Sequence, residues 1–225
     1  RHIYVSSDAN DVNTYIPFME GYHMAYGKYP CKTPADAGYG SFENYSYCKE
    51  HEIDLYMKYS TLRKQQEELN DKNRFKSYRM QPDENGQILC PEGKEFTLEK
   101  ETIDTTGKYK KKIRHYRNEH CADCPFRSKC TKSKQGRTLT INEELIEYQN
   151  EVLTNLSSDE GKELMKQRSI QAEGIFGQIK QDNNYARLCR RGNPGVKLEL
   201  LLVSMGHNLR RYHTRKKQNE HKLMA

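Results

Sequence analysis

The sequence from Ser157 to Arg191, SSDEGKELMKQRSIQAEGIFGQIKQDNNYARLCRR, contains a predicted helix whose acid Glu173 is set apart from its main face. Ser157 followed by Glu160 is the capping-box arrangement that starts a helix. Long side chains then recur at helical spacing, at Leu164, Arg168, Gln171, Ile175 and Ile179. We therefore expect a mostly buried helical face and, off that face, the carboxylate of Glu173.

Two glycines, Gly174 and Gly177, flank the line of Glu173. Each costs a helix about 1 kcal/mol relative to alanine, so their position indicates that something bulky approaches the backbone there. Lys180 lies two turns beyond Glu173 along the same face. The alternative interpretation is a solvated Glu–Lys face with incidental glycines.

The composition describes a charged chain with a modest core. Of its 225 residues, 34% are hydrophobic and 31% are charged. The formal net charge of +7 favours a polyanionic partner. No apolar run approaches the roughly 18–20 residues of a membrane span, so no membrane partner is expected. The start, RHIYVSSDAN, has no signal peptide, and seven cysteines are then expected to be reduced thiols or metal ligands.

Strand-like and helical segments alternate over the first sixty residues. Strands are predicted at 2–6, 32–35 and 53–59, and helices at 15–26 and 41–50. This rhythm is typical of an α/β sheet. Asp36 directly follows the second strand, and functional groups of such sheets collect where the strands end. The alternative role for Asp36 is that of a turn-forming residue close to Gly38.

The alternation stops after residue 60. Residues 62–77 are charged and helix-prone, and residues 78–117 contain short strand-like pieces broken by prolines and glycines. Within them, GKYKKKIRHYR at 107–117 is a basic ribbon that carries aromatic residues. It is a candidate DNA contact, although a charge run of this kind is more often a solvated face. Residues 139–156 predict a further helix.

Four cysteines in this middle region have metal-ligand spacing. Cys121 and Cys124 form a C-x-x-C knuckle, Cys130 follows, and Cys90 precedes a proline in a similar turn context. Four thiolates match the tetrahedral preference of structural zinc, and His115 or His120 could replace one of them. The alternative is a set of reduced cysteines in a loop-rich module. A redox knuckle is less favoured because no thioredoxin-like strand and helix surround it. The other cysteines, Cys31, Cys48 and Cys189, are expected to be ordinary core or surface residues.

The C-terminal segment combines an apolar stripe with a basic end. Residues 196–215 predict a packing helix through Leu198, Leu201, Leu202, Met205 and Leu209. From Arg187 to Lys222 there are ten lysines or arginines against only Glu199 and Glu220. A basic segment bordering a carboxylate site is what phosphate contact requires, and it would make binding depend strongly on salt.

Taken together, these motifs resemble a bacterial insertion-sequence transposase of the DDE class, with a ribonuclease H-like core and a cysteine-containing insertion. The residues that carry the resemblance are Asp36-Ala37-Gly38-Tyr39, Glu43-Asn44-Tyr45, the Cys90 and Cys121/Cys124/Cys130 pattern, Glu173 with Phe176-Gly177 and Lys180, Arg191-Gly192, Glu199 and Asn208-Leu209-Arg210-Arg211. The resemblance covers most of the chain, in the same order of elements.

The resemblance implies a two-metal phosphoryl-transfer site. Asp36 would be the second catalytic Asp and Glu173 the catalytic Glu, because Mg²⁺ takes hard oxygen ligands and two such ions stabilise an in-line displacement. Lys180 matches a lysine that contacts transposon-end DNA. In the related pattern an Arg stands four residues before the Glu, whereas here Ser169 holds that position and the arginine is Arg168. The DNA-contacting residues expected are Arg168, Lys180, Arg187, Arg190, Arg191, Arg210 and Arg211.

The family's first Asp lies on the central strand of its 3-2-1-4-5 sheet, and nothing in the chain matches that strand. Asp8 and Asp11 are poor substitutes because they follow what would be the third strand. We therefore expect an N-terminally truncated core that is inactive and poorly folded by itself. The expected organisation is a first half of the core at 1–60, an insertion at 61–156, the C-terminal core helices at 157–217 and a tail at 218–225.

The resemblance also implies the partners: double-stranded DNA, as transposon ends and target, and a homodimer or larger assembly on it, in the bacterial cytoplasm. Two other functions stay open at this point. One is a non-catalytic DNA-binding module built from the zinc-like insertion and the basic C-terminus. The other is a ribonuclease H-like nuclease that cuts DNA without strand transfer.

Overall fold

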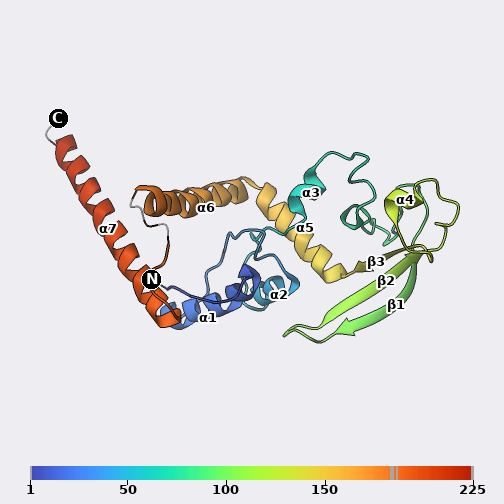
Figure 1. Ribbon diagram of the computed structural model, residues 1–225, viewed down its shortest axis with the longest axis horizontal. Helices are drawn as coiled ribbons and strands as arrows, with labels where there is room; N and C mark the ends of the chain where they lie inside the picture. Colours follow the sequence, from blue (N-terminus) through green and yellow to red (C-terminus); the bar gives the residue numbers. More distant parts are fainter. Residues whose placement is uncertain (1, 183–184, 186, 224–225) are drawn as a thin grey trace.

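The computed structural model describes residues 2–182, 185 and 187–223, and within them the side chains at 173, 175, 176, 181, 182 and 220–223 are not described. The order of elements is η1 (Asp11–Thr14), α1 (Tyr15–Tyr26), α2 (Phe42–Glu50), α3 (Leu62–Gln66), η2 (Ser77–Arg79), β1 (Thr97–Asp104), β2 (Lys111–Asn118), α4 (Arg127–Cys130), β3 (Arg137–Ile141), α5 (Glu143–Ser157), α6 (Asp159–Gly177), η3 (Gln178–Asp182) and α7 (Asn193–Leu223). Figure 1 shows α1 and α2 below α5 and α6, with the sheet at one end and α7 at the other.

The main core lies between α1, α2, the segment 53–62 and α5. Helix α1 ends at Gly27, whose positive φ of 71° closes the helix in the left-handed conformation that glycine adopts without strain. Helix α2 starts at Ser41, whose side chain accepts a hydrogen bond from the backbone N–H of Asn44. Both predicted helices of this region are therefore confirmed. The core is rich in tyrosine and contains Tyr45, Tyr47, Met19, Leu55, Met57 and Val152.

The predicted strands of the first sixty residues are present only as traces. Lys32 forms a β-bridge with Asp54 and Ala35 with Met57, both in parallel, so segments 32–35 and 53–59 lie side by side. Neither forms a continuous strand, and residues 2–6 are not a strand. Two parallel segments without further neighbours are marginal in water, which explains why the pairing stops at isolated bridges.

The sheet of the described chain lies in the middle region instead. Its order is β1-β2-β3, with both pairs antiparallel. A second core of Met80, Ile88, Phe96, Tyr116 and Leu139 packs beside it. The strand-like pieces before residue 118 are thus confirmed in β1 and β2. The helix predicted from 139 is wrong at its start, because residues up to Ile141 belong to β3 and α5 begins at Glu143.

The capping residue of α6 is shifted by one position from the prediction. Ser158, not Ser157, accepts the hydrogen bond from the backbone N–H of Gly161, at 2.9 Å. Ser157 belongs to the last turn of α5 and donates back to the Leu153 carbonyl at 2.7 Å. Glu160 is therefore not a capping-box partner and is free for another contact.

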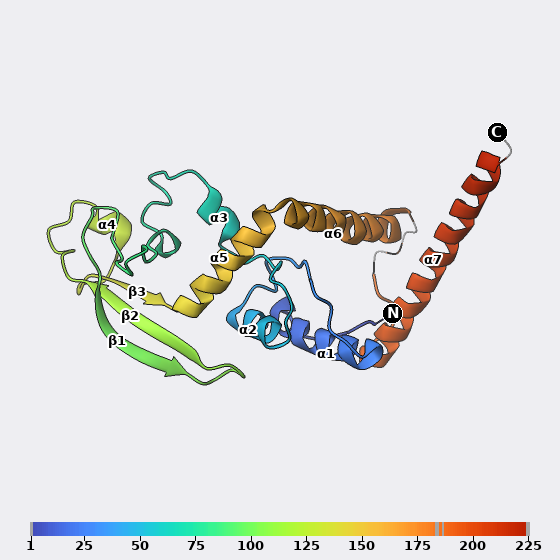
Figure 2. The same ribbon diagram turned by 180° about the vertical axis from the view of Figure 1, so that it is seen from behind.

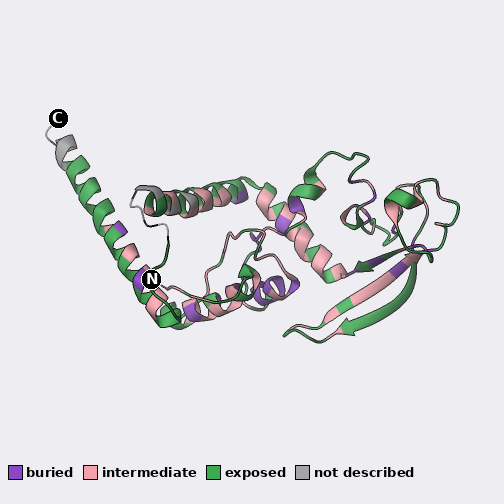
Figure 3. Cartoon of the chain, viewed as in Figure 1, coloured by how far each residue is buried: buried purple, intermediate pink, exposed green. Residues whose placement is uncertain are grey.

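Helix α7 extends away from the rest of the chain (Figures 1 and 2). Its N-terminal Pro194 suits a first helical turn, where the missing N–H is not needed. The prediction that its apolar stripe packs in the core is wrong in this structure: Leu202 is 52% exposed, Met205 59% and Leu209 67%. Figure 3 shows α7 as mostly exposed, in contrast to α2. Among the described helices, none is long and apolar enough to cross a membrane.

Candidate active site and nucleic-acid interface

Asp36 lies in an exposed turn directly after the parallel bridge at Ala35. The turn is closed by the Tyr39 N–H, which donates to the Asp36 carbonyl at 3.1 Å. Gly40 then runs so close to the Lys58 carbonyl oxygen that a Cβ atom would collide with it, which keeps the turn against the neighbouring segment. The Asp36 side chain is 60% exposed, and its Oδ2 lies 2.7 Å from Nη2 of Arg168 on α6. The sequence analysis predicted that Arg168 contacts DNA. In the structure Arg168 instead forms an ion pair with Asp36, the predicted catalytic aspartate.

A second polar contact aligns α6 with the same segment. Glu160, in the first turn of α6, pairs with Lys32 and accepts a hydrogen bond from Tyr56 at 3.2 Å. The eight residues from Glu160 to Arg168 span about 12 Å of helix. The four residues from Lys32 to Asp36 span about 13 Å of extended chain. The two ion pairs therefore fit a helix that runs alongside segment 32–36 in the same direction.

The residues beyond Arg168 are described only in part. Glu173 belongs to α6, but its side chain lies outside the described residues. On an ideal helix, residue 173 lies about 140° around the axis from residue 168. Cβ atoms added at Gly174 or Gly177 would meet nothing within 4 Å, so the bulky group expected beside these glycines is not supplied by the described chain. Lys180 is exposed in the π-helical turn η3, and such turns are frequent at functional sites.

An open cavity lies along the other side of segment 32–35. It measures about 780 Å³ and is lined by α1, by the N-terminal residues and by Lys32 to Ala35. Backbone hydrogen bonds of this segment to 54–58 use the carbonyls of Cys31 and Ala35. Successive residues of an extended chain point their backbone groups to opposite edges. The backbone carbonyls of Lys32 and Pro34 therefore point away from 54–58, toward the cavity. Aromatic side chains of Tyr15, Phe18, Tyr22 and Tyr39 complete the lining.

The four predicted zinc cysteines lie around one small cavity of about 20 Å³, lined by Cys90, Cys121, Cys124 and Cys130. Burial raises the pKa of the Cys130 thiol, the nearby Arg137 opposes this, and the other three cysteines add to the rise. The backbone N–H of Arg137 donates to Sγ of Cys121 at 3.4 Å, and the Cys121 thiol donates to the Asn118 carbonyl oxygen at 3.3 Å. All four thiols are free.

Only one of the two histidines proposed as substitute ligands lies at the cysteine cavity, and the other three cysteines lie elsewhere. Of the proposed substitutes, His120 lines the cavity, whereas His115 on β2 bonds Thr102 at 2.9 Å. In their present positions, no three His, Cys, Asp or Glu side chains of the described chain are arranged to hold a metal ion. Cys48 is a core residue and Cys31 and Cys189 are exposed, as expected.

The basic ribbon is largely neutralised by the protein itself. Its cations pair with carboxylates, in the pairs Lys108–Glu50, Lys111–Glu43, Lys112–Glu101, Arg114–Glu101, Arg114–Glu143 and Arg117–Glu99. The pKa of the Glu101 carboxyl is lowered by its hydrogen bonds to Arg114 and Lys112. These pairings favour the solvated-face interpretation over DNA contact by the ribbon.

The C-terminal cations are arranged differently. Arg187, Arg190 and Arg191 are exposed on the connection before α7, and none of the three forms an ion pair with a described residue. Arg210 and Arg211 are exposed on α7. Exposed positive charge of this kind favours a polyanionic partner.

The chain matches one known protein family over its middle and C-terminal parts. Residues 89–213 match the family model of the transposase DDE domain. This match covers more than half of the chain, so the chain belongs to the transposase DDE domain family and is a DDE-class transposase. Members of this family act on DNA and generally use a divalent metal, Mg²⁺. The matched range contains the four predicted zinc cysteines, α6 and most of α7, but not Asp36. No curated protein and no solved structure matches the chain.

Proposed function

We propose that this chain is part of a DNA transposase that cleaves insertion-sequence ends and joins them to target DNA by two-metal phosphoryl transfer, with Asp36 and Glu173 as catalytic carboxylates. The observation that carries the proposal is the ion pair between Asp36 and Arg168, which ties the turn after segment 32–35 to the helix that carries Glu173. The pair brings together two segments that are far apart in the sequence, each of which carries one of the two acids.

The described residues alone do not make a magnesium site. Asp36 offers one exposed carboxylate, and its present partner is a guanidinium. When bound, two Mg²⁺ ions would stabilise the attacking and leaving oxygens of the displacement. The chain's own part is to place Asp36 at the end of its segment and to hold α6 alongside it. Because residue 173 lies about 140° around α6 from Arg168, the proposed site requires α6 to turn and the Asp36–Arg168 pair to open.

We further propose that the ribonuclease H-like core is incomplete in this chain. The support is the open cavity beside segment 32–35, whose outer edge lacks a partner strand among the described residues. A strand inserted there would pair with 32–35, cover Phe18, which is now 37% exposed, and bring an acid next to Asp36. In this proposal, the absence of the central strand explains two features. Segments 32–35 and 53–59 pair only through isolated bridges, and the apolar residues of α7 remain exposed.

The experiment compares this chain with a form extended by about 30–40 residues encoded upstream at its native locus. The extended form should cut terminal-repeat DNA in the presence of Mg²⁺, and the 225-residue chain should not. Asp36→Asn and Glu173→Gln in the extended form should each abolish cutting. Mg²⁺-dependent cutting by the shorter chain would overturn the proposal of an incomplete core, and cutting by either variant would overturn the assignment of the two acids.

We also propose that Cys90, Cys121, Cys124 and Cys130 bind a structural zinc ion. The support is that four thiols from two separate segments surround a cavity about the size of one water-sized sphere. Their sulfur atoms would have to draw in to about 2.3 Å from the metal. Zinc bound there would tie the turn at Cys90 to the loop before β3 and so fix the insertion.

Metal analysis of the folded chain tests this proposal. About one zinc per chain is expected, and Cys124→Ser should lose it. Cys189→Ser is the matched control, because Cys189 is an exposed thiol outside the cluster, and it should keep the metal. Folded protein without stoichiometric zinc would end the zinc proposal and leave the transposase proposal untouched.

We propose that the DNA surface consists of the exposed arginines Arg187, Arg190, Arg191, Arg210 and Arg211 with Lys180, acting in a homodimer or larger assembly on paired ends. Offering pre-cut ends and target DNA separates a transposase, which yields joined products, from a nuclease, which yields nicks alone. A non-catalytic binding module would instead be unaffected by Glu173→Ala and would lose DNA binding when zinc is removed.

A further inference from the structure

Glu199 is a buried acid in α7, a helix that is mostly exposed and carries many basic residues. The residue lies in the second turn of α7 and is only 8% exposed, whereas its neighbour Leu198 is 47% exposed. Nothing in the chemistry proposed above uses it. A buried carboxylate is costly unless both of its oxygens are satisfied, so its partners indicate its role.

All three described partners of Glu199 come from the connection that precedes α7. Oε1 accepts hydrogen bonds from the Tyr185 hydroxyl and from the backbone N–H of Cys189, the latter at 2.8 Å. Oε2 accepts from the backbone N–H of Arg190 at 2.7 Å. These bonds, led by that from Tyr185, lower the pKa of the Glu199 carboxyl, and the same contact raises the pKa of Tyr185 to about 12.

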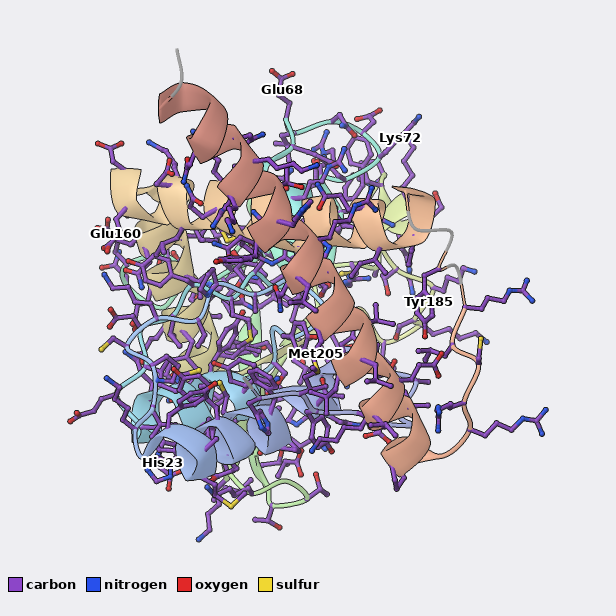
Figure 4. The ribbon with its side chains drawn as sticks, turned by 90° about the vertical axis from the view of Figure 1, so that its left-hand side faces the viewer. His23, Glu68, Lys72, Glu160, Tyr185 and Met205 are labelled. Carbon is purple, nitrogen blue, oxygen red and sulfur yellow. The ribbon has the colours of Figure 1, made fainter. Side chains whose placement is uncertain are left out.

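The connection is bent back so that it can reach this carboxylate. Gly192 has a positive φ of 73°, which glycine adopts without strain, and the chain reverses there into α7. The Val196 N–H then donates to the Gly192 carbonyl at 3.0 Å as the helix begins. Figure 4 shows Tyr185 on the connection beside α7, which crosses the front of this view with Met205 on it.

The segment held in this way is the one with the exposed arginines. Because the backbone N–H groups of Cys189 and Arg190 are committed to Glu199, the backbone of 189–190 is fixed relative to α7. Arg187, Arg190 and Arg191 are exposed around this fixed point. The charge of Arg190 also lowers the pKa of the Glu199 carboxyl, whereas Arg187 and Arg191 form no ion pair with a described acid. Ordering a loop before binding reduces the entropy lost when its side chains meet a ligand.

We propose that Glu199 is a positioning residue that holds the arginine-bearing connection 187–191 in the conformation in which it contacts DNA phosphates. This inference rests on the proposed DNA-binding function and adds an acid to a surface otherwise defined by its cations. Removing an ordinary surface acid strengthens binding to a polyanion such as DNA. Removing the negative charge of Glu199 should instead weaken DNA binding.

Binding of a 20-base-pair duplex by the full chain, measured over a range of salt concentrations, tests the proposal. Glu199→Gln keeps the size of the side chain but replaces one acceptor oxygen by an NH₂ donor, which cannot serve both N–H groups. DNA affinity should fall severalfold, and the slope of log K against log salt should become shallower by about 1 or more, since each lost phosphate contact is worth about 0.9. Glu163→Gln is the control, because Glu163 is an exposed acid on α6 and its removal changes the net charge equally. That variant should bind DNA as tightly as the parent chain or more tightly.

Two further variants separate the possible failures. Tyr185→Phe removes one of the three hydrogen bonds and should give a smaller loss in the same direction. Replacing Arg187, Arg190 and Arg191 by alanine should weaken binding strongly, and adding Glu199→Gln to that triple variant should then change nothing more. If the triple variant weakens binding but Glu199→Gln does not, the positioning role is wrong and the DNA surface stands. If the triple variant binds DNA as tightly as the parent chain does, connection 187–191 does not contact DNA. Both its place in the proposed DNA surface and the positioning role of Glu199 are then wrong.

Discussion

The carboxylate of Asp36 and the guanidinium of Arg168 lie 2.7 Å apart, although 131 residues separate the two in the chain. A guanidinium on a carboxylate neutralises the charge that a divalent metal ion would use. The pair therefore has two effects in the proposed site: it brings α6 to Asp36, and it competes with metal for the same oxygens.

Replacing Arg168 by glutamine should strengthen metal binding at Asp36. The ion pair is partly exposed, and such pairs are worth up to about 1 kcal/mol, so the gain in Mn²⁺ affinity should be at most about fivefold. Calorimetric titration of the extended form with Mn²⁺ measures it. Lys166→Gln, two residues away on α6 and paired with Glu163, is the control and should change little. Unaltered or weaker Mn²⁺ binding by Arg168→Gln would show that the arginine does not compete with metal.

The helix start at Ser158 can be tested against its neighbour. Ser158→Ala removes the side-chain acceptor of the Gly161 N–H and should destabilise α6 by about 1 kcal/mol. Ser157→Ala removes only a bond back to the Leu153 carbonyl and should have an effect near zero. Amide hydrogen exchange along α6 compares them. Equal effects of the two substitutions would contradict the assignment of Ser158 as the cap.

Low pH should weaken the contact between Lys32 and Glu160 and so destabilise the first turn of α6. The hydrogen bond and charge of Lys32, with a smaller contribution from Tyr56, lower the pKa of the Glu160 carboxyl. A carboxyl with a depressed folded-state pKa contributes stability above its unfolded pKa, about 4.3, and loses it as pH falls through the folded value. Exchange in the first turns of α6, corrected for intrinsic rates, should therefore rise on acidification below pH 4.3. Glu160→Gln should remove this dependence; if the variant keeps it, another group is responsible.

Gly40 and Gly206 should respond in opposite directions to alanine. A Cβ at Gly40 would collide with the Lys58 carbonyl and the Tyr59 backbone, so Gly40→Ala should cost about 1–3 kcal/mol. A Cβ at Gly206, in the middle of α7, meets nothing within 4 Å, so Gly206→Ala should stabilise that helix by up to about 1 kcal/mol. Urea unfolding followed by circular dichroism measures both. Stability gained by Gly40→Ala would contradict the close packing of the Asp36 turn.

Local patterns in the sequence were sufficient for helices α1 and α2 and for the cysteines. Ser41 and Gly27 mark the ends of α2 and α1 by chemistry that acts within one turn, so α1 and α2 could be predicted. The gathering of Cys90 with the C-x-x-C knuckle could be predicted as well, because their residue type and spacing suggest a common ligand. The identity of the ligand remains a prediction.

Contacts between distant segments could not be predicted. No periodicity indicates that Arg168 faces Asp36, that Glu160 meets Lys32, or that Glu199 holds the N–H groups of Cys189 and Arg190. Ser157 and Ser158 are chemically identical as caps, and only the packing of Gly161 against the end of α5 selects the second. The segments 2–6, 32–35 and 53–59 have the composition of strands. A strand also needs a partner strand to hydrogen-bond with, and a local sequence pattern does not show whether that partner is present.

The central claim is that Asp36 and Glu173 bind the same metal ions. The most direct test replaces Mg²⁺ by Fe²⁺ in the extended form on terminal-repeat DNA and maps the backbone cuts made by the hydroxyl radicals generated at the metal. We expect cuts close to both residue 36 and residue 173, suppressed by excess Mg²⁺ and absent in Asp36→Asn. Cuts near only one of the two positions, or at neither, would contradict the claim.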